Sequence, residues 1–179
     1  LLNITEKTIH AGRSVYMPIP KFGRGLEIIQ TLNKTENKFL VYADRNIYEQ
    51  AKQRNSLWMN TSAVSVRPFE TWNGEPAVLF VSDPQLRKKE NYELAVKIYK
   101  DGGAILLTGH VYPNTGAEQL LDKRYAGQIL YPVHMNYHEV CDFVKANHIS
   151  SVVLNHYAGE INDKKHIALD VAIGTTIEF

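Results

Sequence analysis

Short, almost continuous apolar runs alternate with longer amphipathic segments along most of this chain, and this alternation restricts the fold more than any other feature. The apolar runs are residues 14–19, 39–42, 77–81 and 104–108. Apolar residues at helical spacing predict helices over residues 22–32, 44–54 and from about 92 to 101. Strands that are apolar on both faces and joined by helices are typical of a covered parallel sheet. We therefore predict an α/β fold, a three-layer Rossmann-like arrangement of a mostly parallel sheet with helices on both faces.

The strand–helix alternation weakens near Gly127, which predicts two domains. Residues 1–126 carry the alternation, and residues 127–179 form a shorter α/β tail. The segment from Asn55 to Pro76 is polar and is expected to be irregular. The chain begins without methionine inside a partial helical pattern that closes at Gly12, so we interpret it as a fragment of a longer protein.

The composition is ordinary for a globular protein and limits the classes of function. With 179 residues, 44% of them hydrophobic and 22% charged, the chain can bury a substantial core. A formal net charge of +1 gives no electrostatic argument for nucleic-acid binding. Cys141 is the only cysteine, which excludes an internal disulfide and favours a reducing, cytoplasmic location. No apolar run approaches the length of a membrane span, so no membrane partner is expected.

Two histidines follow strand-like runs late in the chain. His134 comes just before a helix that is expected to begin at Asn136, and His156 follows the apolar run that ends at Leu154. Open α/β sheets bind ligands at the carboxyl ends of their strands, and imidazole can transfer protons or bind a metal. On spacing alone, a hydrogen-bonded structural histidine is the simpler interpretation of each.

Glycine-bearing turns follow two of the predicted strands. The first reads Pro20-Lys-Phe-Gly-Arg24, and the second runs from Gly109 and His110 to Thr115 and Gly116. Small residues let backbone N–H groups approach a phosphate, and Arg24 supplies a forked donor. Neither turn is a Walker loop or a dinucleotide-binding fingerprint. An unrelated nucleotide-binding Rossmann-like protein is therefore the least favoured alternative.

Taken together, these segments resemble the β-CASP group of the metallo-β-lactamase superfamily, which includes ribonuclease J and the endonuclease subunit of the polyadenylation machinery. The Gly-Arg turn with Glu27, the loop to Thr115-Gly116, and His134 followed by a helix are similar to motifs of that group. His156 with Gly159-Glu160 resembles the last of those motifs. The order and spacing of the motifs over residues 1–160 carry the resemblance.

The resemblance implies a metal-dependent hydrolase, a nuclease that acts on RNA or DNA. It implies that His134 is the catalytic acid or transition-state donor and that His156 completes a two-metal zinc site. It also implies that the substrate is bound by Gly23, Arg24, Glu27, Thr115 and Gly116. Residues 1–126 would be the β-CASP-like domain, and residues 127–179 would return to the metallo-β-lactamase fold.

The His-x-His-x-Asp-His motif, which supplies most metal ligands in that superfamily, does not occur in this sequence. We therefore expect the fragment to be inactive by itself, without bound zinc, and to need the missing metal-binding half. The other expected partners are RNA or DNA and a second copy of the chain in a homodimer. A divergent binding or assembly module without catalysis, and a hydrolase of a smaller substrate, remain as alternatives.

Overall fold

In the part of the chain that the structure describes, six parallel strands form a single sheet in the order β3-β2-β4-β1-β5-β6. The computed structural model describes residues 1–33, 35, 39–53, 66–131 and 137–148. The strands are β1 (Val15–Pro18), β2 (Val41–Ala43), β3 (Val66–Pro68), β4 (Val78–Val81), β5 (Ala104–Leu107) and β6 (Ala126–Gln128). In the register, Val15 of β1 pairs with Val78 on one side and with Ala104 on the other. The predicted α/β fold with a parallel sheet is confirmed.

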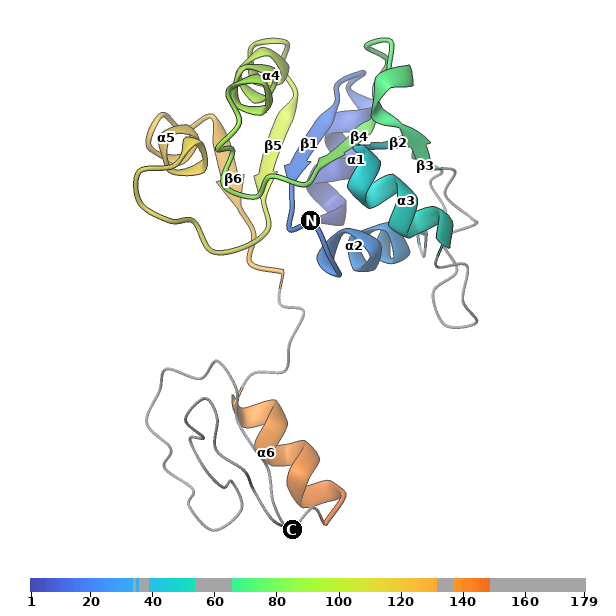
Figure 1. The fold of residues 1–179 in the computed structure, drawn as a ribbon, viewed down its shortest axis with the longest axis vertical. Coiled ribbons are helices and arrows are strands. Elements are labelled where there is room, and N and C mark those ends of the chain that lie inside the picture. Colours follow the sequence, from blue (N-terminus) through green and yellow to red (C-terminus); the bar gives the residue numbers. More distant parts are fainter. Residues whose placement is uncertain (34, 36–38, 54–65, 132–136, 149–179) are drawn as a thin grey trace. The chain divides into compact units, whose positions relative to one another are not determined.

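Helices cover both faces of this sheet, as the sequence predicts (Figure 1). They are α1 (Leu2–His10), α2 (Arg24–Asn33), α3 (Arg45–Gln53), α4 (Lys89–Lys100) and α5 (Gly116–Asp122), with a short 3-10 helix η1 (Phe69–Thr71). Helices α1, α2 and α3 pack on one face, and α4 and α5 pack on the other. Within the described ranges, no helix has the length and apolar character needed to cross a bilayer.

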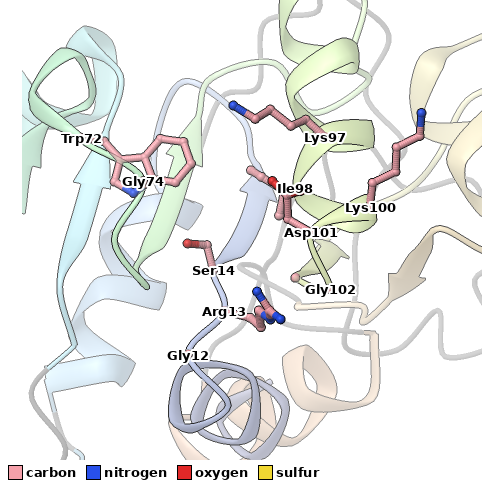
Figure 2. Close-up of a pocket in the computed structure, with 11 residues that line it drawn as sticks. Gly12, Arg13, Ser14, Trp72, Gly74, Lys97, Ile98, Lys100, Asp101 and Gly102 are labelled. Carbon is pink, nitrogen blue, oxygen red and sulfur yellow. The ribbon is translucent and has the colours of Figure 1, made fainter.

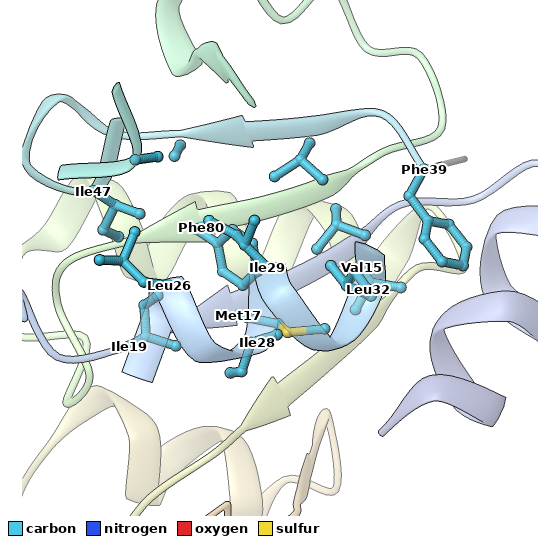
Figure 3. Packing of buried hydrophobic residues seen from close by; sticks show 14 of the residues in the cluster. Val15, Met17, Ile19, Leu26, Ile28, Ile29, Leu32, Phe39, Ile47 and Phe80 are labelled. Carbon is cyan, nitrogen blue, oxygen red and sulfur yellow. The ribbon is translucent and has the colours of Figure 1, made fainter. Parts of the chain in front are cut away.

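The sheet separates two hydrophobic cores, and β1 contributes to both. Because neighbouring side chains of a strand point to opposite faces, Val15 and Met17 enter the core under α1 to α3, whereas Tyr16 enters the core under α4 and α5. Figure 3 shows Ile28 of α2 beside Met17 in the first core, and Leu26 of the same helix near Ile19 and Ile47. Burial on both faces explains why the strands read as continuous apolar runs instead of alternating ones.

Local caps end and begin several helices where the sequence predicts. Gly12 adopts a φ of +73° directly after the C-cap of α1, a conformation that glycine adopts without steric cost. Asp44 precedes α3, and its Oδ1 accepts a hydrogen bond from the backbone N–H of Ile47 at 3.2 Å. Thr115 caps α5, and its Oγ1 accepts from the N–H of Glu118 at 3.3 Å.

The two edge strands, β3 and β6, carry too little sequence signal to be predicted. The expectation that residues 55–76 are wholly irregular is wrong, because Val66–Pro68 pairs in parallel with β2. Proline is tolerated there because an edge strand has a neighbour on one side only. Strand β6 pairs with β5 and has a glycine at its centre. Both strands are defined by their hydrogen-bonded neighbours and not by an apolar pattern.

The chain divides into two compact units, Leu1–Val133 and His134–Phe179. The first unit extends beyond residue 126 because β6 completes its sheet. In the second unit the described element is α6 (Tyr137–Ala146), in which Cys141 and Val144 are buried. The apolar run that ends at Leu154 lies outside the described residues. A return of residues 127–179 to the metallo-β-lactamase fold stays a prediction.

Gly103 gives a direct test of the packing at the start of β5. A Cβ at this position would lie 2.5 Å from the carbonyl oxygen of Ser14 and 2.6 Å from Cγ2 of Ile98. Since one of these atoms is backbone, we expect Gly103→Ala to lower the free energy of unfolding by about 1–3 kcal/mol. The measurement is urea denaturation. Gly127→Ala is the matched control, because its nearest neighbour would be 3.9 Å away, and equal stability losses in both variants would contradict this account.

Candidate functional site: a crevice at the carboxyl edge of the sheet

The connections that leave three neighbouring strands diverge at the carboxyl edge of the sheet. Strand β1 leads to α2 on one face, whereas its neighbours β4 and β5 lead to α4 and α5 on the other (Figure 1). Such a switch point leaves a crevice in which open α/β sheets bind ligands. A crevice with a volume of about 320 Å³ lies here, and its lining includes Arg24, Gln85, Thr108, Gly109 and His110.

Arg24 reaches from the start of α2 to the end of β5. Its guanidinium lies so close to Gly109 that a Cβ on that glycine would collide with Nη1. The Nε of Arg24 and the Oγ1 of Thr108 are both buried, and neither has a hydrogen-bond partner in the part of the chain that the structure describes. A buried polar atom without a partner costs about 1–3 kcal/mol. A bound acceptor group would remove that cost, so the crevice is suited to an anion.

Gln85 holds the loop after β5 in place from the neighbouring loop after β4. Its Nε2 donates to the carbonyl of His110 at 2.8 Å, and its Oε1 accepts from the N–H of Tyr112 at 2.9 Å. Its own carbonyl accepts from the N–H of Ala117 at 3.1 Å. Gln85 is only 8% exposed, so these bonds are shielded from water. No sequence signal marks Gln85 as a positioning residue, because its partners lie 25 or more positions away.

The loop after β4 is itself tightly held. Leu86 has a φ of +51°, an unfavourable conformation for a residue with a branched side chain. The carboxylate of Asp83 stabilises this loop by accepting hydrogen bonds from the backbone N–H groups of Arg87 and Lys88, each at 3.0 Å. It also accepts one from the side chain of Asn91 at 2.9 Å. Local strain that the surroundings compensate is common at binding sites.

Exposed aromatic rings stand in the two loops that border the crevice. Phe22 precedes Arg24 and is 68% exposed, and Tyr112 follows His110 and is 53% exposed. The ring of His110 meets that of Tyr112 edge to face, with the ring centroids 5.0 Å apart. Exposed planar rings beside a cation are suited to stacking with unpaired bases.

The glycine–arginine turn contributes to the crevice in part. Arg24 lines it, and Gly23 forms the preceding turn with a φ of +79°. Glu27 lies one helical turn further along α2 and is not among the lining residues. Of these three candidates, Arg24 is therefore the one whose side chain the structure places at the crevice.

The other predicted substrate-binding pair lies beside the crevice. Thr115 and Gly116 line a neighbouring pocket of about 430 Å³, together with Arg87 and Lys89. The hydroxyl of Thr115 donates to the carbonyl of Tyr112 at 2.7 Å while it also caps α5. These bonds give Thr115 a structural role. The pocket nevertheless places two cations, Arg87 and Lys89, next to the loop that carries Thr115.

The histidines predicted to be catalytic and metal-binding, His134 and His156, lie outside the described residues. Within the described part of the chain, no three His, Cys, Asp or Glu side chains gather closely enough to hold a metal ion. The zinc site that the resemblance implies, with His156 as a ligand, stays a prediction.

Tyr16 is a buried titratable residue of the central strand β1. Burial first, and then the negative charges of Asp83, Asp44 and Glu90, raise the pKa of Tyr16 well above its ordinary value. Its hydroxyl donates to the carbonyl of Asn91 at 3.2 Å. The phenol is therefore neutral at physiological pH and bonded to the backbone, which is a structural role and not that of a proton-transfer group.

The crevice combines a forked cation, a buried hydroxyl and exposed aromatic rings. Both of its unpartnered polar atoms, Arg24 Nε and Thr108 Oγ1, can donate a hydrogen bond, and two donors beside a guanidinium favour a negatively charged oxygen ligand. No protein-family model matches the chain, and no curated protein matches it. The function is accordingly inferred from the residues and contacts of the site.

Proposed function

We propose that this chain is the substrate-gripping part of a metal-dependent hydrolase of the β-CASP type, a nuclease that acts on RNA or DNA. In this proposal the crevice binds a phosphate group of the nucleic-acid strand. The observation that carries it is the pair of buried donors without partners, Arg24 Nε and Thr108 Oγ1. A planar guanidinium matches the geometry of phosphate oxygens better than a lysine does.

The aromatic rings around the crevice support a strand as the substrate instead of a small anion. Phe22 and Tyr112 are more than half exposed, although Gln85 holds the loop of Tyr112 and Gln50 donates to the carbonyl of Lys21 beside Phe22. Base stacking on such rings contributes about 1–3 kcal/mol per base and does not depend strongly on sequence. A phosphate site with rings nearby is therefore suited to single-stranded nucleic acid.

The hydrolytic part of the proposal rests on the resemblance. His134 would donate a proton or stabilise the transition state, and His156 would be a ligand of a two-zinc site in the full-length parent protein. When bound, the zinc ions would supply an activated water and charge stabilisation. The remaining ligands would come from sequence outside this chain. A cytoplasmic location belongs to the same proposal and is supported by the single cysteine, Cys141.

Substitution of Arg24 tests the phosphate site. We expect Arg24→Gln to weaken binding of a fluorescein-labelled single-stranded RNA about 10-fold, measured by fluorescence anisotropy, because hydrogen bonds to a charged group contribute about 1.5–3 kcal/mol. The slope of log affinity against log salt should become shallower by about 0.7, the value for one lost phosphate contact on a single strand. Arg24→Lys keeps the positive charge but lacks the forked guanidinium, so its affinity should lie between those of the unchanged protein and Arg24→Gln.

Lys52→Gln is the matched control, because Lys52 lies exposed near the end of α3 and does not line the crevice. It should bind the RNA with the affinity of the unchanged protein. Affinity in Arg24→Gln equal to that of this control would overturn the phosphate site. If Arg24 is required for binding and the full-length parent protein does not cleave the bound strand, the alternative of a non-catalytic binding module is favoured.

A further inference from the structure

A third pocket, larger than the crevice, lies at the opposite, amino edge of the sheet. It has a volume of about 470 Å³, within the usual range for small-ligand sites. Its lining comes from the segments that lead into three neighbouring strands, with Ser14 before β1, Gly74 before β4 and Gly103 before β5. Figure 2 shows Trp72 on one side of this pocket and Lys97 of α4 on the other, with Ser14 and Arg13 between them.

The pocket carries an excess of positive charge. Its lining includes Arg13, Lys97 and Lys100 against a single acid, Asp101. None of the three cations forms an ion pair with another residue that the structure describes. The whole chain is close to neutral, so this local excess is not a consequence of the composition. The charge indicates an anionic ligand.

The aromatic side of the pocket is fixed before any ligand binds. The Nε1 of Trp72 donates to the carbonyl of Glu75 at 2.8 Å, and the indole packs against Phe69 with the ring centroids 6.0 Å apart. A ring held in this way loses little conformational entropy when a ligand stacks on it. The N–H of the indole is already used, so Trp72 offers a ligand a stacking surface and no further donor.

The backbone at the base of the pocket is also held closely. Ser14 is used internally, since its Oγ donates to the carbonyl of Glu75 and accepts from the N–H of Ala77, each at 3.2 Å. Gly102 has a φ of +82°, and a Cβ on it would approach Nε of Arg13 at 3.3 Å. The absence of a side chain at Gly102 therefore leaves room for the guanidinium of Arg13 beside the turn.

We propose that the amino-edge pocket binds a nucleotide unit, with the phosphate at Arg13 and Lys97 and the base stacked on Trp72. A nucleotide presents an anionic and a planar part at the same time, which matches the two sides of this pocket. The unit can be a free mononucleotide or one residue of a single strand, because both present the same chemistry. This inference does not depend on the proposed nuclease function, since the pocket and the crevice share no lining residue.

The fluorescence of Trp72 can report ligand binding directly once the other tryptophan, Trp58, is replaced by phenylalanine. In the Trp58→Phe protein we expect adenosine 5′-diphosphate to quench the fluorescence of Trp72 in a saturable way. Adenosine without phosphate should bind at least about 10-fold more weakly, the loss expected when hydrogen bonds to a charged group are removed. Comparison with a single-stranded oligoadenylate distinguishes the two sources, because tighter binding of the oligomer indicates a strand and equal binding indicates a free nucleotide.

The charged side of the pocket is tested by Arg13→Gln and Lys97→Gln in the same background. Each should weaken binding of the diphosphate about 3- to 10-fold, whereas Lys52→Gln, which lies outside the pocket, should leave it unchanged. No saturable quenching by either nucleotide probe would overturn the proposal. Equal affinities in Arg13→Gln, Lys97→Gln and Lys52→Gln would overturn it as well, even if quenching occurs.

Discussion

Replacing Phe80 with alanine is expected to lower the free energy of unfolding by about 3–5 kcal/mol. Phe80 lies in β4 at the centre of the sheet, is fully buried, and packs in the core between the sheet and α1 to α3 (Figure 3). The substitution removes the apolar surface of the ring and leaves a cavity that the paired strands on both sides cannot close. Urea denaturation monitored by circular dichroism measures the loss.

Phe22→Ala is the matched control for this prediction. It removes the same side chain at a position that is 68% exposed, where a change of no more than about 0.5 kcal/mol is expected. If Phe80→Ala leaves too little folded protein to measure, Phe80→Leu keeps most of the volume and should cost less than about 1.5 kcal/mol. Equal stability of the Phe80→Ala and Phe22→Ala proteins would contradict the assignment of Phe80 to the core.

The second large effect concerns catalysis by the hydrolase proposed above, in a protein that also carries the metal-binding half. If His134 donates a proton in the reaction, His134→Ala should lower phosphodiesterase activity about 100- to 10,000-fold while the zinc content stays unchanged. If His156 is a metal ligand, His156→Ala should lower both the activity and the zinc content. Activity is measured on a labelled single-stranded RNA, and zinc is measured by atomic emission on the purified protein.

His10→Ala is a suitable control for both variants, because His10 is exposed at the end of α1, outside the crevice. It should retain full activity and zinc. Full activity in both His134→Ala and His156→Ala would refute the roles that the resemblance implies. Loss of activity together with loss of zinc in His134→Ala would instead make this residue a metal ligand.

Most of the fold could be predicted because its signals are local. Apolar runs predicted β1, β2, β4 and β5, and the helix that Asp44 caps, α3, was predicted from residue 44. The edge strands β3 and β6 were missed, since three residues with a proline or a glycine resemble a loop. Their strand character depends on hydrogen bonds to β2 and β5, and these partners are distant in the sequence.

The candidate site could be predicted only in part. Arg24 and Gly109 were each recognisable from turns that follow strands, but the sequence does not show that one packs against the other. Gln85 and Thr108 carried no signal, although one positions the loop after β5 and the other offers a buried donor. The amino-edge pocket was not predicted either, because its cations come from two separate segments.

The sequence by itself determined that this chain alternates strands with helices and buries a parallel sheet on both faces. It also determined where polar and glycine residues follow the strands, because periodicity and capping are properties of neighbouring residues. The tertiary structure alone decided the strand order, which places β1 between β4 and β5. That order places Arg24 beside Thr108 and Gly109. It also places Trp72 at the pocket that Arg13 and Lys97 line. Both arrangements depend on crossover connections, which bring together segments that are distant in the sequence.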